Sequence, residues 1–261
     1  MPPAVTLLVI ALVAAGASAL TFFSGFGLGT LLMPAFALFY PIEVAVASTA
    51  VVHFLSGVFK LTLVGRHANR RVVLLFGLPA LAAAYLGATV LLTLVDLPPL
   101  ASYDFIGRPV TVQPAKAAIG LLLMGFTVLE LSPRFASVSF PPKWLPVGGV
   151  LSGFFGGVSG MQGALRSAFL IRAGLSKEAF IGTGVVIACL IDVARLVDYV
   201  PNLMGRRAEL DSPTLAVAVL AAFAGAIAGN RYLKKMTLDR LQRIVAVMLL
   251  LVAIGLVAGI L

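Results

Sequence analysis

The sequence predicts an all-α membrane protein built from two inverted-topology repeats, each a glycine-broken (re-entrant) helical hairpin plus three transmembrane helices. Three observations lead to this prediction: the composition, two glycine-dense apolar stretches half a chain apart, and the placement of the basic residues. Of the 261 residues, 61% are hydrophobic and 11% are charged, whereas about 25% of the residues of a typical soluble domain are charged. The chain therefore belongs in a lipid bilayer.

A helix that crosses a bilayer needs about 20 apolar residues. The chain divides into apolar segments at 4–40, 43–64, 71–95, 112–131, 144–172, 177–200, 212–233 and 241–261. The first and fifth segments are too long for one straight crossing, and each contains glycines in its middle, so each is expected to break into a hairpin. The first repeat then covers residues 1–131 and the second covers residues 144–261. The side of the membrane on which the N-terminus lies is left open.

The two glycine-dense stretches run from Ser24 to Thr30 and from Gly153 to Gly163. Broken backbone at bilayer depth exposes N–H and C=O groups that lipid cannot satisfy, so it is tolerated only inside protein or beside a watery cavity. Phe22-Phe23 and the glycines after it align with Phe154-Phe155 and the glycines after it. This spacing indicates a duplication with the binding site at the breaks.

The basic residues test the orientation of the two halves. Two re-entrant hairpins leave three crossings in each half, and an odd number turns the second half upside down. One face then carries Arg66, Arg70, Arg71, Arg134, Lys143, Arg172, Lys177, Arg231, Lys234, Lys235, Arg240 and Arg243, and the other carries Arg108, Lys116, Arg206 and Arg207. Because basic loops stay in the cytoplasm, the first face is predicted to be cytoplasmic.

Glycine and other small residues recur in both halves in a similar order. The first half has Gly25-x-Gly27-x-Gly29, Pro34 and Ala47-Ser48-Thr49, and the second has Leu151-Ser152-Gly153-Phe154, Gly156-Gly157, Gly160, Gly163 and Gly182-Thr183. Over nearly the whole chain this pattern resembles the sulfite exporter TauE/SafE family. The resemblance implies a transporter of sulfur-containing anions such as sulfite, sulfonates or sulfoacetate, in the bacterial cytoplasmic (inner) membrane.

The residues point to an anion by a separate route. The second half-helices of the hairpins, roughly 29–40 and 162–172, are expected to begin near the middle of the bilayer. A helix N-terminus carries about half a positive charge and unpaired N–H groups, and glycine lets an oxyanion approach the backbone. The predicted substrate-binding residues are Ser24, Gly25, Gly27, Gly29, Thr30, Thr49, Ser159, Gly160, Gln162, Gly163, Arg166 and Thr183.

Arg166 is the most informative charge, because an arginine at membrane depth is costly unless it faces a cavity or a partner. Its planar guanidinium can bind two oxygens of a sulfonate or carboxylate. The alternative is a structural contact to Asp192 or to backbone carbonyls. Asp192 and Arg195, three residues apart on one helix, can form an ion pair, either as a gate or as a structural element.

His53 lies one helical turn after Thr49 on the same helix face. Histidine changes charge between about pH 5 and 8, so His53 is a candidate for proton coupling. The alternative is a hydrogen bond between helices. Whether protons, sodium or neither drive the transport stays open.

Other function classes lack their motifs. The sequence has no H-E-x-x-H, G-x-S-x-G or G-x-x-x-x-G-K-[ST] motif, so no enzyme, cofactor or metal site is predicted. The net charge of +9 follows membrane topology rather than a nucleic-acid surface. The expected partners are a small anionic substrate and the lipid bilayer, with a homodimer left open. A carboxylate transporter and a non-transporting membrane scaffold for sulfur metabolism remain as alternatives.

Overall fold

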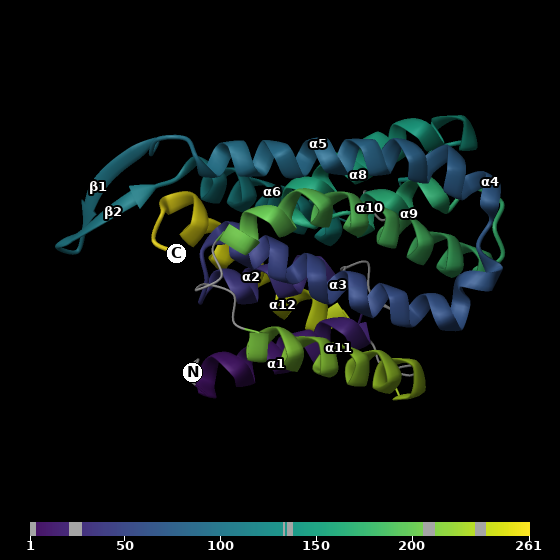
Figure 1. Ribbon diagram of the computed structural model, residues 1–261, viewed down its shortest axis with the longest axis horizontal. Helices are drawn as coiled ribbons and strands as arrows, with labels where there is room; N and C mark the ends of the chain where they lie inside the picture. Colours follow the sequence, from purple (N-terminus) through teal and green to yellow (C-terminus); the bar gives the residue numbers. More distant parts are fainter. Residues whose placement is uncertain (1–3, 21–27, 133, 135–137, 206–211, 233–238) are drawn as a thin grey trace.

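The structure, a computed structural model, describes residues 4–20, 28–132, 134, 138–205, 212–232 and 239–261 (Figure 1). These residues form an elongated helical bundle from which one β-hairpin projects. Four helical segments are long and apolar enough to cross a membrane: Ile42–His67, Arg70–Val95, Pro114–Leu131 and Lys177–Asn202. The prediction of an all-α membrane protein is confirmed for the described residues, with the hairpin as an addition.

The first half of the chain contains two short helices before its long ones. Its elements are α1 (Ala4–Leu20), α2 (Leu28–Ala37), α3 (Ile42–Val64), η1 (Gly65–His67), α4 (Arg70–Val72), η2 (Val73–Gly77), α5 (Leu78–Val95), β1 (Ala101–Phe105), β2 (Arg108–Val112) and α6 (Pro114–Leu131). The described parts of the predicted long segment 4–40 are the helices α1 and α2, and the break expected between them falls on residues 21–27, outside the described part of the chain.

The second half follows the same order. Its elements are η3 (Pro142–Trp144), α8 (Leu145–Ser159), α9 (Gly163–Leu170), α10 (Lys177–Gly205), α11 (Ser212–Tyr232) and α12 (Asp239–Ala258). The predicted segment 144–172 breaks after Gly160, and the half-helix expected at 162–172 is α9. The break at glycine is thus observed in this half.

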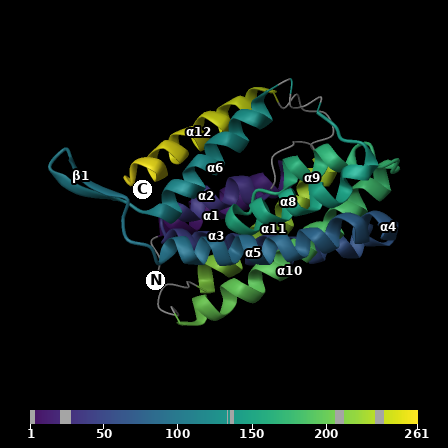
Figure 2. The ribbon, with the colours of Figure 1, turned by 90° about the horizontal axis from the view of Figure 1, so that it is seen from above.

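The helices of the two halves pack against each other in an exchanged pattern. Helix α1, the first helix of the first half, lies along α11. Helix α8, the first long helix of the second half, lies along α5, which has the place in the first half that α11 has in the second. Helix α3 pairs with α10, and α6 pairs with α12. The α3–α10 pair is antiparallel, because Gly57 lies against Cys189 and Gly182 lies against Val64. Helices α6 and α12 also run in opposite directions (Figure 2).

The bundle has two different ends. At one of them, which we call the basic end, α10 begins beside η1, and the ring of Phe140 stacks on Phe169 with the centroids 4.2 Å apart. The basic end carries Arg66, Arg70, Arg71, Lys143, Arg172 and Lys177 in η1, α4, η3 and the segment that leads from α9 into α10. The opposite, or hairpin, end holds the β-hairpin, whose Tyr103 hydroxyl donates to the carbonyl of Ala258 over 2.6 Å.

The β-hairpin was not predicted. Strands β1 and β2 pair antiparallel from Ala101 with Val112 to Phe105 with Arg108. The two loop residues, Ile106 and Gly107, have φ angles of 54° and 72°, as a tight type I′ turn requires. The alternation of aromatic and β-branched residues before and after Gly107 was the available signal.

Helix α8 approaches α5 through a row of glycines. A Cβ added at Gly153 would lie 2.1 Å from the carbonyl oxygen of Ala80, a distance that no side chain tolerates. The same holds one turn away on either side. The row consists of Gly149, Gly153 and Gly157, facing the carbonyls of Phe76, Ala80 and Ala84. Small residues at such spacing let helix backbones approach closely in a membrane, so this row holds the second hairpin to α5.

We predict that Gly153→Leu separates α8 from α5 and lowers the free energy of unfolding by at least about 1–3 kcal/mol, the usual cost of overpacking. The matched control is Gly125→Leu on α6, because nothing lies within 4 Å of a Cβ added at Gly125. The thermal midpoint of each purified variant in detergent is the measurement. A wild-type midpoint for Gly153→Leu would contradict the packing described here.

Candidate functional site

The break between α8 and α9 is closed by small residues. Gly160 ends α8 in the left-handed conformation with φ of 81°, and its N–H donates to the carbonyl of Gly156 over 2.9 Å. The hydroxyl of Ser152 donates to the carbonyl of Gln162 over 3.0 Å. The N–H of Met161 donates to the Ser159 hydroxyl oxygen over 3.4 Å. The glycine allows the turn, and the two serines satisfy backbone groups that the turn leaves unpaired.

The start of α2 meets this break. A Cβ added at Gly29, in the first turn of α2, would lie 2.6 Å from the carbonyl oxygen of Gly160. Thr30, the next residue of α2, is buried. Because α2 and α9 both start here, the positive ends of two helix dipoles lie close together in the interior of the bundle.

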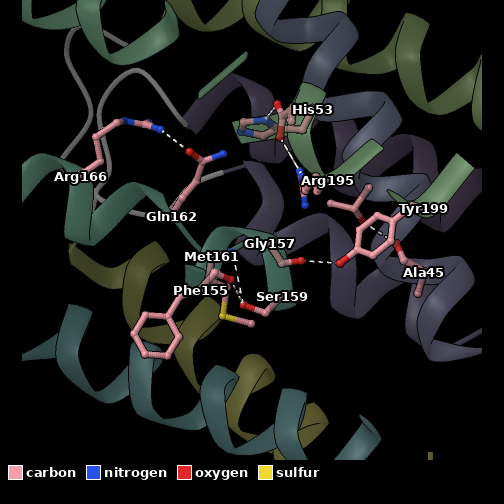
Figure 3. Close-up of polar contacts among 12 residues, drawn as sticks. Ala45, His53, Phe155, Gly157, Ser159, Met161, Gln162, Arg166, Arg195 and Tyr199 are labelled. Carbon is pink, nitrogen blue, oxygen red and sulfur yellow. Dashed lines mark hydrogen bonds and ion pairs between the residues drawn. The ribbon is translucent and has the colours of Figure 1, made fainter. Parts of the chain in front are cut away.

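A buried charged cluster from α3 and α10 lies beside the break (Figure 3). The His53 Nδ1 atom lies 2.5 Å from Asp192 Oδ2. Arg195 donates to the other carboxylate oxygen, Asp192 Oδ1, from Nε over 3.0 Å and from Nη2 over 2.7 Å. The side chains of Asp192 and Arg195 are fully buried. The predicted Asp192–Arg195 pair therefore exists, and His53 is its third member.

One donor of Arg195 points to the break without a partner. A Cβ added at Gly160 would lie 2.9 Å from Arg195 Nη1, so this nitrogen abuts the turn. Arg195 Nη1 is buried and has no hydrogen-bond partner among the described residues. A guanidinium only donates hydrogen bonds, so the group that would satisfy Nη1 must be an acceptor.

A second unpartnered donor comes from the break itself. Arg166 Nη1 donates to Gln162 Oε1 over 2.9 Å, and this contact fixes the amide because arginine cannot accept. Gln162 Nε2 therefore points away from Arg166, as Figure 3 shows. This nitrogen is buried and has no partner among the described residues. Two buried side-chain donors beside the break thus lack an acceptor among the described residues, which suits an oxyanion.

The structure brings together part of the predicted set. Gly29, Thr30, Ser159, Gly160, Gln162, Gly163 and Arg166 lie at or next to the point where the start of α2 meets the break. Ser24, Gly25 and Gly27 lie outside the described residues. The hydroxyl of Thr49 donates to the carbonyl of Ala45 within α3, one turn from His53.

Thr183 does not reach this region. Its hydroxyl oxygen accepts from the N–H of Asn69 over 2.8 Å at the basic end. Twelve residues of α10 separate Thr183 from Arg195, a rise of about 18 Å. Thr183 holds α10 to the segment after η1. The alignment of Thr183 with Thr49 therefore does not place the two side chains in the same region.

Tyr199, which the sequence did not point to, lies beside the break. It lies one turn after Arg195, is buried, and donates its hydroxyl to the carbonyl of Gly157. On its other side it lines a cavity of about 30 Å³ at the hairpin end, together with Glu43, Asp96 and Asn202 among others. Its position at i+4 from an intramembrane arginine was the available signal.

Comparison with known proteins agrees with this architecture. The family model described as "Sulfite exporter TauE/SafE" matches residues 10–256 of the chain. The chain belongs to the TauE/SafE family. No curated protein and no solved structure matches it. Membership of this family makes the chain an integral membrane protein of a transporter family for anions, and the predicted resemblance is confirmed.

We predict that Gly160→Ala weakens anion binding by at least about tenfold, as expected when a hydrogen bond to a charged group is lost. The new methyl group would press on Arg195 Nη1 and would also strain the backbone. Gly174→Ala is the matched control, since Gly174 has a φ of 70° and open space around an added Cβ. Thermal-shift titration of both variants is the measurement, and equal losses in both would assign the effect to backbone strain alone.

Proposed function

We propose that this TauE/SafE member is a secondary transporter or uniporter that moves a small sulfur-containing anion of the sulfite, sulfonate or sulfoacetate type, and that it has no enzymatic activity. The observation that carries the proposal is the buried Nη1 of Arg195, which abuts the break at Gly160 and has no acceptor among the described residues. The anion binds where the start of α2 meets the α8–α9 break.

The energy of burial supports this assignment. A buried donor without a partner costs about 1–3 kcal/mol, and more when it is charged. An oxyanion bound at Arg195 Nη1 and Gln162 Nε2 removes this cost for both donors and adds the attraction of the α2 and α9 N-termini. Donors that are fixed before binding lose little entropy on binding.

The number of donors favours a sulfur oxyanion over a carboxylate. A sulfite or sulfonate group carries three oxygens, and the donors come from three directions: Arg195 on α10, Gln162 in the break, and the first turns of α2 and α9. A carboxylate has only two oxygens for the same donors. A carboxylate transporter is therefore the second candidate, distinguished by a binding screen.

The transport mechanism that we propose is alternating access between two inverted repeats, 1–131 and 144–261. The exchanged packing of the halves and the antiparallel α3–α10 and α6–α12 pairs support it, since inverted repeats that move against each other around a central site are common in secondary transporters. Tyr199 lies between the cavity at the hairpin end and Arg195, so its contact with Gly157 closes that route.

The alternative function is a membrane scaffold in which the glycines serve only helix packing. Proteoliposomes that contain the purified protein separate the two functions. Uptake of labelled sulfite or methanesulfonate above that of empty liposomes is expected, whereas a scaffold gives no flux. Dicarboxylates in the same assay test the carboxylate candidate.

We predict that Arg195→Lys weakens anion binding by about 1.5–3 kcal/mol, the scale of a hydrogen bond to a charged group, because lysine keeps the charge but loses the planar fork. Arg166→Lys is expected to fail in the same way if Arg166 also contacts the anion directly. Arg172→Lys at the basic end is the matched control. Affinity is measured by thermal shift, and wild-type affinity in Arg195→Lys would remove this residue from the site.

The basic end is predicted to face the cytoplasm, in a bacterial cytoplasmic membrane, because basic loops are retained on that side. A cysteine at Ala68 in the basic end should therefore react with an impermeant maleimide only from the cytoplasmic side. A cysteine at Ser102 in β1 should react only from the opposite side. Labelling of both from one side would contradict this topology.

A further inference from the structure

We infer that the anion is carried together with a proton, which His53 takes up on Nε2. The carboxylate that His53 shares with Arg195 couples this proton to the anion. The inference rests on the proposed anion site and adds the coupling ion. Asp192 connects the two processes, because one of its oxygens contacts His53 and the other contacts Arg195.

The contact with Asp192 defines which ring nitrogen of His53 carries a proton. An ionised carboxylate only accepts, so the contact of 2.5 Å between His53 Nδ1 and Asp192 Oδ2 requires a proton on Nδ1. In the neutral ring Nε2 then carries a lone pair and can take up a proton. The His53 side chain is 13% exposed, whereas Asp192 is fully buried. His53 is therefore the member of this pair that a proton can reach.

Anion binding changes how the negative charge of Asp192 is compensated. Arg195 supplies the positive charge that compensates the buried carboxylate, through Nε and Nη2. An anion at Nη1 shares that charge, and a buried carboxylate that loses part of its compensation is costly. His53 contacts the other carboxylate oxygen, Asp192 Oδ2. A proton on His53 therefore supplies the positive charge that Asp192 loses when Arg195 binds the anion.

The other basic residues of this part of the bundle are Lys60 on α3 and Arg166 on α9, and Arg166 lies against Gln162 and Gly184. The coupling that we infer runs through Asp192. An anion at Arg195 Nη1 favours a proton on His53 and, by linkage, a proton on His53 strengthens anion binding.

Among the described elements around α3, η1 carries the exposed Arg66 and His67 at the basic end, and Asp198 of α10 accepts from the Thr89 hydroxyl of α5. Helix α2 and residues 212–228 of α11, which pack against α3, contain no charged or titratable side chain. Tyr85, on α5, is exposed. On α10, Cys189 is a buried thiol and Tyr199 is engaged with Gly157.

Two acidic residues lie farther off, at the hairpin end. Glu43 and Asp96 line the cavity at that end. Glu43 precedes His53 by ten residues of α3, a rise of about 15 Å. The proton balance is therefore simple: one proton joins Nε2 as the anion enters and leaves as the anion departs, and transport of a monovalent anion is electroneutral.

The first test is the pH dependence of binding. The probe is methanesulfonate, which has no titrating group between about pH 5 and 8, the range in which histidine changes charge. In the wild-type protein its affinity should rise as pH falls, by up to about tenfold per pH unit, as expected for one linked proton. In His53→Gln, where the amide can still donate to Asp192 but cannot take up a proton, the affinity should not depend on pH.

His67→Gln is the matched control, because His67 is an exposed histidine of η1 and its loss should leave the pH dependence intact. The thermal midpoint of His53→Gln without ligand reports whether the variant is folded. Binding by the wild type with no pH dependence, or a retained pH dependence in His53→Gln, overturns proton coupling at His53. No binding by the wild type at any pH overturns the proposed anion site itself.

The second test uses proteoliposomes. A proton gradient of one pH unit, acid outside, should drive the wild-type protein to accumulate methanesulfonate by about tenfold, since one pH unit corresponds to about 1.4 kcal/mol for each coupled proton. His53→Gln should exchange labelled for unlabelled anion without accumulating it. Accumulation by His53→Gln overturns the inference, whereas absence of all flux in the wild type overturns the transport function.

Discussion

The site depends on one constraint: a backbone that breaks inside a bilayer must find its hydrogen-bond partners within the protein. At the α8–α9 break, Ser152 donates to the carbonyl of Gln162, and Tyr199 donates to the carbonyl of Gly157. These contacts satisfy two carbonyl groups of the break. Arg195 Nη1 and Gln162 Nε2 are buried donors beside it that have no acceptor among the described residues. Two such donors next to the start of α9 are suited to an anion.

The glycines divide into two sets with different physical roles. Gly149, Gly153 and Gly157 face the α5 backbone, and their missing side chains set the distance between two helices. Gly160 faces Arg195 and has a left-handed conformation, so it shapes the site. The two sets follow each other on one helix, and the packing row therefore holds the turn, and the donors around it, in a fixed position against α5. Packing and binding are coupled through α8.

The sequence predicted the features that depend on composition and periodicity. The membrane class, the family and the break at Gly160 follow from apolar segments and glycine spacing, which act locally. The partners of single side chains depend on which helices meet. The sequence placed Asp192 and Arg195 on one face of a helix, but it could not show that His53, 139 residues away, contacts the same carboxylate.

Symmetry was also a poor guide to single residues. Thr183 is the counterpart of Thr49 by alignment, yet it caps a segment at the basic end. The β-hairpin was not predicted because its segment, residues 101–112, is short and more polar than the long apolar helices on either side. Its Gly107 turn and alternating pattern were weaker signals than the helices around them.

The polar residues of the site are distributed unequally between the two halves, and this bears on how many anions are bound. Gln162, Arg166, Asp192 and Arg195 all belong to the second half, and the first half contributes His53 and backbone around Gly29. Two equivalent repeats would give two equivalent sites, but among the described residues the start of α2, the α8–α9 break and the charged cluster lie together. On the proposed function, the second half therefore holds the anion while α2 packs against it, and α3 adds the proton. Asp192 of α10, which contacts both His53 of α3 and Arg195, is the residue through which the two halves of the chain act on one anion.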